Sequence, residues 1–517
     1  MKLDPVDLNV FHHLLAAIPE EMGVLLRRSA FSPNIKERLD FSCALTGSQG
    51  DMAAQASHIP VHLGSVHVTG RHLLERVDMR PGDLILLNDP YKGGTHLPDV
   101  TVFAPVFVPR RRGMMMGVMC RAHHADIGGA WPGSMGPVND VHGEGLIIPP
   151  VRLVREGEMD EDILAMVLAN TRTPDERRGD LLAQAAAVEL GRRRVLELFE
   201  QHGARRLQAA VDGLRSHAAR VTRATLRELP DGTWRSEASL DGPGTPKICV
   251  SISKRRDRLV VDFAGTDAAI DAPFNANEAI TLSAVFYVVR LLVREDLPTN
   301  SGCLDPVTVR IPAGCLLNAQ TPSPVAGGNV ETSQRIVDVL LLALAEAAPD
   351  RVPACSQGTM NNLTAGGRRA DGSPFTFYET LGGGAGGGPA GPGVSGIQTH
   401  MTNTLNTPIE ALEAAYPVLV RQYRLRDGSG GAGRHEGGDG LIRELEARER
   451  MRVTMLAMRR SDGAPGVGGG ASGAAGRDRV RTVGGKWRPL PAGQSVTLDP
   501  GDRIRVETPG GGGWRKG

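Results

Sequence analysis

The sequence predicts an α+β fold, in which mixed and antiparallel sheets pack against a layer of helices and the C-terminal part is glycine-rich β structure. Three observations predict it. Residues 5–29 carry apolar side chains at helical spacing, and residues 160–228 are rich in Ala, Leu, Arg and Glu. Short runs of β-branched and aromatic residues, separated by turn signals, fill much of the rest. From Tyr423 onward, glycine interrupts these runs.

Changes in composition divide the chain into four sub-regions. A length of 517 residues by itself allows roughly two to four domains. Residues 1–159 form a β-rich part with a candidate metal site, and residues 160–229 form the helical layer. Residues 230–422 form a central α/β part, where a meander of strands precedes two apolar helices. Residues 423–517 form the glycine-rich β part.

The most informative stretch runs from Asn88 to Gly129, where two polar loops flank an apolar hairpin. VTVFAPVFV reads as a strand, PRRRG as a turn centred near Arg111, and MMMGVMC as the returning strand. Residues equally far from the turn of an antiparallel hairpin face each other, so Asp99 lies opposite His123. His96 and Asp126 lie just beyond that pair. Two imidazoles and two or more carboxylates would suit a divalent metal ion.

Several residues before the hairpin are further candidates. Asp40 stands at the start of the predicted strand DFSCAL, where it is either a metal ligand or an ordinary capping residue. His58 and His62 flank IPV in a predicted loop and are candidates for lining a site. His67 and His72 fall in an apparent helix, where surface or core imidazoles are the usual explanation.

Composition excludes several classes of function. The net charge of +1 provides no global field to attract nucleic acid or a membrane surface. No apolar run reaches the roughly 20 residues that span a bilayer, and the acidic N-terminal segment does not resemble a signal peptide. Six cysteines without a C-x-x-C pair favour neither a zinc ribbon nor a disulfide scaffold, so the reducing cytoplasm is the expected location. The sequence contains no P-loop, nucleophile elbow or H-E-x-x-H motif.

Eight motifs distributed along the chain resemble those of the hydantoinase B/oxoprolinase family. They are ERLDFSCAL, HIPVHLGS, NDPYKGGTHLPD, RAHHADIGG, NTRTPDERRGDLLAQ, YETLGGGAGG, THMTNT followed by TPIEALE, and the terminal TPGGGGW. The resemblance extends from the first helix to the last glycines, which implies that residues 1–517 form one unit of this type. One segment, GAPGVGGGASG, lacks the aromatic residue associated with that loop, which puts its role in partner docking in doubt.

The resemblance implies a hydrolase that acts on carbon–nitrogen bonds in cyclic amides such as hydantoin, 5-oxoproline or a lactam. A hydantoinase A-type partner subunit would use ATP to activate the substrate, and this chain would not bind ATP itself. The two would form a hetero-oligomer with a dimeric core. Alternatives on the same scaffold are a subunit of an acetone- or acetophenone-type carboxylase, and a non-catalytic subunit with a structural metal.

The resemblance also implies the metal ligands, which are Asp40, His96, His123 and Asp126, around one divalent ion such as Zn, Mn or Fe. Asp99 would then orient a ligand or replace one.

Further roles follow as hypotheses. His124, His58 or Asp99 would move the proton, Lys92 and Arg121 would supply positive charge, and backbone N–H groups of Gly383 and Gly384 would contact substrate or phosphate. A flexible linker is the alternative for the glycine-dense run 382–396, and Cys120 is expected to pack rather than react.

Overall fold

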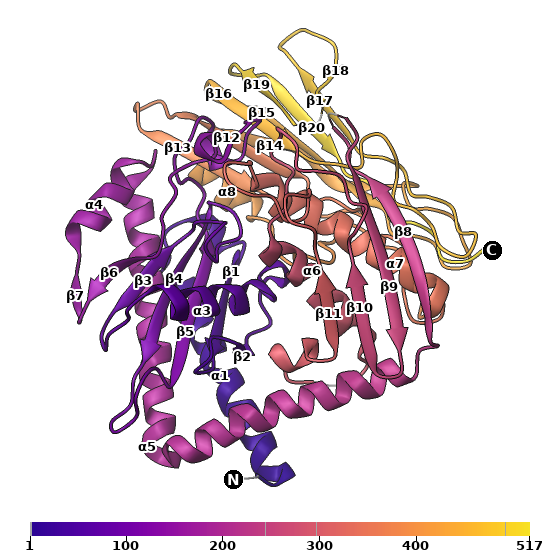
Figure 1. Ribbon diagram of the computed structural model, residues 1–517. Helices are drawn as coiled ribbons and strands as arrows, with labels where there is room; N and C mark the ends of the chain where they lie inside the picture. Colours follow the sequence, from indigo (N-terminus) through magenta and orange to yellow (C-terminus); the bar gives the residue numbers. More distant parts are fainter. Residues whose placement is uncertain (1–2, 243, 296, 492) are drawn as a thin grey trace.

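The computed structural model describes residues 3–242, 244–295, 297–491 and 493–517. It confirms the predicted α+β class, because four separate sheets of mixed or antiparallel strands pack against helices (Figure 1). Within the described residues, no helix is both long and apolar enough to cross a membrane.

The N-terminal part is built on a seven-stranded antiparallel sheet with the strand order β2-β1-β5-β4-β3-β6-β7. Its strands are β1 (Phe41–Thr46), β2 (Met52–Gln55), β3 (Leu84–Leu87), β4 (Asp99–Val106), β5 (Met116–His123), β6 (Val151–Arg155) and β7 (Glu158–Met159). Strands β4 and β5 are the predicted hairpin, and every one of their residues is buried. A strand buried on both faces explains why their sequence is almost continuously apolar.

Successive residues of β4 and β5 face two different cores. Val102 and Cys120 pack with α1 (Pro5–Ser29) and α5 (Pro174–Arg227), whereas Phe103 and Met119 pack on the other side with α3 (Ser65–Arg76). The alternation follows from the two-residue period of a strand. In these two strands, the side chains of odd-numbered residues therefore point away from α5, and those of even-numbered residues point toward it.

Helix α5 connects the N-terminal and central parts. Its first half covers the seven-stranded sheet, and its second half runs along the base of the molecule toward β8 and β9 (Figure 1). Gly203, at φ 74° and ψ 154°, makes the bend between the halves. Such a positive φ strains any residue with a Cβ, so glycine suits this position. The remaining helices are α2 (Pro33–Lys36), α4 (Glu161–Ala169), α6 (Glu278–Leu292), α7 (Ser333–Ala347) and α8 (Ile409–Ala415).

Three smaller sheets complete the fold. The first has the order β11-β10-β9-β8 and packs on α6 and α7, with β10 and β11 parallel. The other two, β13-β12-β16-β19 and β14-β15-β20-β17-β18, enclose an apolar core between them. The strands of these sheets are β8 (Gly232–Ser239), β9 (Lys247–Arg255), β10 (Arg258–Asp262), β11 (Val307–Arg310), β12 (Asn362–Arg368), β13 (Pro374–Glu379), β14 (Val418–Arg426), β15 (Gly440–Ala447), β16 (Met451–Leu456), β17 (Arg477–Arg481), β18 (Arg488–Pro489), β19 (Gln494–Leu498) and β20 (Arg503–Glu507).

Glycine-rich segments at 382–396, 428–440, 463–473 and 510–513 pack directly against one another. Gly438 N donates to Ala385 O at 2.8 Å, and Gly511 N donates to Gly438 O at 2.9 Å. A Cβ added at Gly384 would overlap the Gly438 carbonyl oxygen. Glycine is needed here because backbone meets backbone with no room for a side chain. The run 382–396 is therefore neither a linker nor an open loop.

Candidate metal centre

The hairpin brings Asp99 and His123 together as the sequence predicts. The two residues are directly paired across β4 and β5. Both carry odd numbers, so their side chains leave the sheet on the face away from α5. His96 lies in the loop that precedes β4 and reaches the same face. These three residues offer ligand atoms within 4.8 Å of one another, and all three are buried.

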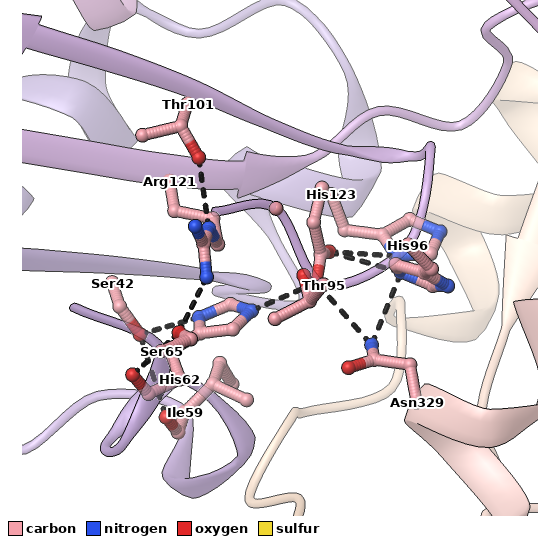
Figure 2. Close-up of polar contacts among 12 residues, drawn as sticks. Ser42, Ile59, His62, Ser65, Thr95, His96, Thr101, Arg121, His123 and Asn329 are labelled. Carbon is pink, nitrogen blue, oxygen red and sulfur yellow. Dashed lines mark hydrogen bonds and ion pairs between the residues drawn. The ribbon is translucent and has the colours of Figure 1, made fainter. Parts of the chain in front are cut away.

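Asp99 is the centre of the group, and its two carboxylate oxygens have different surroundings. Figure 2 shows the side chains of His62, Thr95, His96, His123 and Asn329 converging on this place. Oδ2 receives hydrogen bonds from Thr95 Oγ1 at 2.6 Å, from Asn329 Nδ2 at 3.2 Å and from His62 Nε2 at 3.1 Å. Oδ1 faces His96 Nε2 at 3.1 Å and His123 Nδ1 at 3.4 Å. Three donors fix the carboxylate through Oδ2, which leaves Oδ1 as the oxygen that points at the histidines.

The His96 ring presents a lone pair to Oδ1 of Asp99. Its Nδ1 lies 3.2 Å from the carbonyl oxygen of Ala326, which can only accept, so Nδ1 carries the hydrogen. In the neutral ring Nε2 is then an acceptor, and its single lone pair takes the hydrogen bond that Asn329 Nδ2 donates at 3.1 Å, a bond that an ion held by Nε2 would replace. Two acceptors, Nε2 and Oδ1, therefore lie close together, an arrangement that a cation between them would stabilise.

The spacing of these atoms fits one metal ion. Ligands held at 2.0–2.2 Å around a single ion lie roughly 3.0–3.5 Å from one another, and the two measured separations are 3.1 and 3.4 Å. Two imidazoles and a carboxylate suit zinc, manganese or iron, and three protein ligands leave coordination positions open. The residues present thus fit a divalent ion that keeps coordination positions open.

Burial and neighbouring groups shift the pKa values of the residues in this group. Burial lowers the pKa of His62 and of His123, so both rings favour their neutral form. Burial by itself opposes ionisation of Asp99, but the charges of His96 and His62 and the bonds from His123 and His62 outweigh it. The pKa of Asp99 is consequently held well below its usual range. Asp99 is thus held ionised by positive charge on its neighbours, and a cation bound in place of the histidine protons would supply the same charge.

The group borders a small enclosed cavity of about 10 Å³. The cavity is lined by Asp40, Ile59, Val61, His62, Asp99, His123, Asn329, Val330, Met360, Tyr378, Thr380, Thr402 and Thr404. The wall is assembled from the N-terminal sheet, from the π-helical turn Gly328–Thr332 before α7, and from β13 with the loop that follows it. The Tyr378 ring stacks on His123 at a centroid distance of 4.4 Å, which fixes the plane of the imidazole.

Two of the four predicted ligands lie outside the three-residue group. Asp40 lines the cavity beside it, with Arg38 Nη1 3.7 Å from its carboxylate, and burial raises the pKa of this carboxyl group. Asp126 is elsewhere: its Oδ1 accepts from Arg172 Nη1 at 2.7 Å, and its Oδ2 accepts the backbone N–H of Arg172 at 2.8 Å. The hairpin prediction put Asp126 beside the group because it follows β5, but β5 ends at His123 and the loop beyond it turns the Asp126 side chain to Arg172.

The proton-transfer candidates His124 and His58 also differ from expectation. The Nε2 of His124 bonds Gln184 Oε1 on α5 at 2.8 Å, on the face of the sheet opposite the candidate metal group. Burial lowers its pKa to about 4. His58 packs its ring against Phe41, and its Nδ1 accepts the N–H of Cys43 at 3.1 Å. Neither imidazole lines the cavity, so the structure supports a packing role for both.

The proposed substrate-binding residues are engaged in other contacts. Lys92 is half exposed and pairs with Asp89 at 3.1 Å. The guanidinium of Arg121 is fully buried and donates to the side chains of Thr101, Ser65 and Thr69 and to the Gly93 carbonyl. Burial lowers its pKa to about 10, against the opposing effect of the Asp99 charge. Arg121 therefore ties α3 to the sheet.

Gly383 and Gly384 use their backbone donors within the protein. Gly383 N donates to Ile397 O at 2.9 Å, and Gly384 N donates to Pro509 O at 3.0 Å. Both N–H groups belong to the packing of the glycine-rich segments, and the substrate contact predicted for them is not what the structure shows.

Three residues at the site were not singled out from the sequence. Thr95 stands in the motif that carries His96, so its position was a usable signal. Asn329 and Tyr378 come from the central part, 230 and 279 positions after Asp99 in the numbering. The local signals for them were the glycine pair before Asn329 and, for Tyr378, its place at the start of the motif YETLGGGAGG.

Comparison with known proteins shows the family of the chain. The sequence model of hydantoinase B/oxoprolinase matches residues 4–516. The chain belongs to the hydantoinase B/oxoprolinase family. A curated relative, 5-oxoprolinase 1 of Arabidopsis thaliana, is 39% identical over 540 residues; the match covers 99% of this chain but 42% of that longer protein. Another, the caprolactamase subunit beta of Pseudomonas jessenii, is 30% identical, with 99% of this chain and 91% of that protein covered.

Two solved structures have the same fold as this chain. The ATP-dependent caprolactamase from Pseudomonas jessenii matches with a TM-score of 0.92 at 29% identity, over 100% of this chain and 92% of that one. A nucleotide-free acetone carboxylase matches with a TM-score of 0.89 at 17% identity, over 99% and 76% of the two chains. At that lower identity, the second likeness shows the fold alone.

Proposed function

We propose that this chain is the metal-dependent hydrolytic subunit of an ATP-dependent enzyme that opens a cyclic amide. A partner A-type subunit would bind ATP and activate the amide, and this chain would carry out the hydrolytic step on the activated substrate. The observation that carries the proposal is the buried group His96–Asp99–His123, with ligand atoms at the spacing of one metal ion and a cavity beside it.

Relatives support both the reaction class and the need for a partner. One is named as the beta subunit of a caprolactamase, and others are named 5-oxoprolinases, of which the chain covers about two fifths. The name of the first protein implies a second subunit, which could be the activating chain. The extra length of the 5-oxoprolinases would accommodate an activating domain in the same chain. This is also the arrangement in which the present chain would not itself bind ATP.

When bound, a divalent ion would supply Lewis-acid polarisation and lower the pKa of water. The residues of the chain would do the rest. His96, His123 and Asp99 Oδ1 would hold the ion, and His62 and Thr95 keep the Asp99 carboxylate oriented through Oδ2. Such oriented ligands are typical of working metal sites, because the outer hydrogen bonds fix each ligand in its binding geometry.

Reconstitution with a partner tests the proposal. The chain is co-expressed with an A-type subunit, its metal content is measured by mass spectrometry, and ATP consumption is followed with hydantoin, 5-oxoproline and caprolactam. ATP-dependent ring opening of one of them, lost after chelation and restored by metal, is the expected result. Activity only with a ketone and bicarbonate would select a carboxylase instead. A tightly held ion with no activity on either class would indicate a structural metal.

A further inference from the structure

The cavity wall contains a carboxamide with an unused acceptor. Asn329 is 3% exposed and lines the cavity. Its Nδ2 donates to Asp99 Oδ2 and to His96 Nε2, while its Oδ1 has no hydrogen-bond partner among the residues that the structure describes. A buried carbonyl oxygen without a donor is unfavourable, so its retention beside the candidate metal group requires a reason.

The orientation of this amide follows from its neighbours. Rotating the carboxamide by 180° would place Oδ1, in place of Nδ2, against Oδ2 of Asp99. Oδ2 also accepts hydrogen bonds from Thr95 and His62, so it is an acceptor, and the rotated amide would exchange a hydrogen bond for a repulsive contact between two oxygens. Nδ2 must therefore face the candidate ligands, and Oδ1 must remain free to accept a hydrogen bond.

The size of the cavity limits which molecule can donate a hydrogen bond to Asn329 Oδ1. A space of about 10 Å³ is close to the room that one water molecule needs. It is too small for a ring amide, and a buried water requires two to four polar partners. The Asp40 carboxylate and the hydroxyls of Thr380, Thr402 and Thr404 line the same space. In a cavity of this size, Asn329 Oδ1 and Asp40 would contact the same occupant.

The backbone around Asn329 supports a functional role. Gly328–Thr332 is a π-helical turn directly ahead of α7, and such turns occur frequently at functional sites. A Cβ at Gly328 would overlap the carbonyl oxygen of Asn275, so this turn is pressed against the neighbouring loop. The turn thus holds Asn329 firmly against the ligand group from the opposite part of the fold.

We propose that Asn329 Oδ1, together with Asp40, positions the water molecule consumed in hydrolysis. This inference rests on the proposed function. The water would donate one hydrogen to Oδ1 and the other to the Asp40 carboxylate, which leaves an oxygen lone pair free to attack. Asn329 is thus a catalytic residue supplied by the central part of the chain to a ligand group supplied by the N-terminal part.

The test compares Asn329→Leu and Asn329→Ala with wild type in the complex with the A-type subunit. Two quantities are measured, the metal content and the number of amide rings opened per ATP consumed. We expect both variants to keep the metal and to lose about 100-fold in kcat with little change in KM, because a misplaced reactant costs about that much. The rings opened per ATP should fall as well, since activation by the partner continues without productive attack.

The controls separate the possible failures. Asn170→Leu, at an exposed position at the end of α4, should retain the wild-type ratio of rings to ATP. Circular dichroism verifies that each variant is folded. Asn329→Asp keeps an acceptor at the same place. If the apolar variants do not fold and Asn329→Asp does, Asn329→Asp should recover part of the number of rings opened per ATP. Wild type without ring opening would refute the proposed function. If Asn329→Leu or Asn329→Ala has the wild-type kcat and opens as many rings per ATP as wild type, the water-positioning role is refuted, and the proposed function is not.

Discussion

The adjacent residues His123 and His124 provide the sharpest test of this structure. They leave β5 on opposite faces, His123 toward Asp99 and His124 toward Gln184 on α5. Replacing each in turn with alanine should therefore produce two different defects. In the reconstituted protein, His123→Ala should lose most of its bound metal because one of three ligands is gone, whereas His124→Ala should keep it.

The expected cost of His124→Ala follows from its contacts. The change leaves Gln184 Oε1 as a buried acceptor without its 2.8 Å partner, which costs about 1–3 kcal/mol. The space left by the imidazole adds a cavity cost, for a total of about 2–4 kcal/mol in the free energy of unfolding. Metal content by mass spectrometry and urea denaturation of metal-free protein separate the two effects. A folded His124→Ala protein that loses metal as completely as His123→Ala would show that the assignment of faces is wrong.

Three further predictions concern residues away from the candidate ligands. Asp126→Asn should leave the metal content unchanged and lower the free energy of unfolding by about 1–3 kcal/mol, because Arg172 then loses its carboxylate partner at a half-buried position; a loss of metal would restore Asp126 as a ligand. Gly384→Ala should lower the thermal melting temperature or prevent folding, since its Cβ would meet the Gly438 carbonyl oxygen; an unchanged melting curve would contradict the close packing of these segments. Burial lowers the pKa of His124 from 6.5 to about 4. Below pH 6.5 the unfolded chain therefore binds a proton that the folded chain does not, and stability should fall as pH decreases from 6.5 to 4, by on the order of 3 kcal/mol. Denaturation curves across this range should show a smaller loss for His124→Leu, and an equal loss would exclude this histidine as the cause.

Much of the fold could be predicted from the sequence because local patterns determine local structure. Helical spacing of apolar residues predicted a helix at 5–29, and α1 spans Pro5–Ser29. Turn and strand signals predicted the hairpin and its register, which places Asp99 opposite His123. In both cases the forces that shape the element act between residues close in the chain.

The candidate site could be predicted only in part. Asp99 and His123 are the paired residues at the open end of the hairpin, and His96 lies just before it, so hairpin geometry was enough to bring them together. The same reasoning included Asp126 wrongly among them, because distance from the turn gives the position of a residue but not the face on which a loop residue points. His124 shows the complementary limit, since its place one residue after His123 puts it on the opposite face of the sheet.

The sequence by itself determined the fold class, the family and the central three members of the candidate metal group, since motifs and strand register are properties of short segments. Only the tertiary structure decided which face each histidine occupies and which oxygen of Asp99 is left for a metal. It also brought Asn329 and Tyr378 from the central part to complete the wall of the cavity. The physical reason is that these contacts depend on how separate sheets and helices pack, and no periodicity along the chain records that packing.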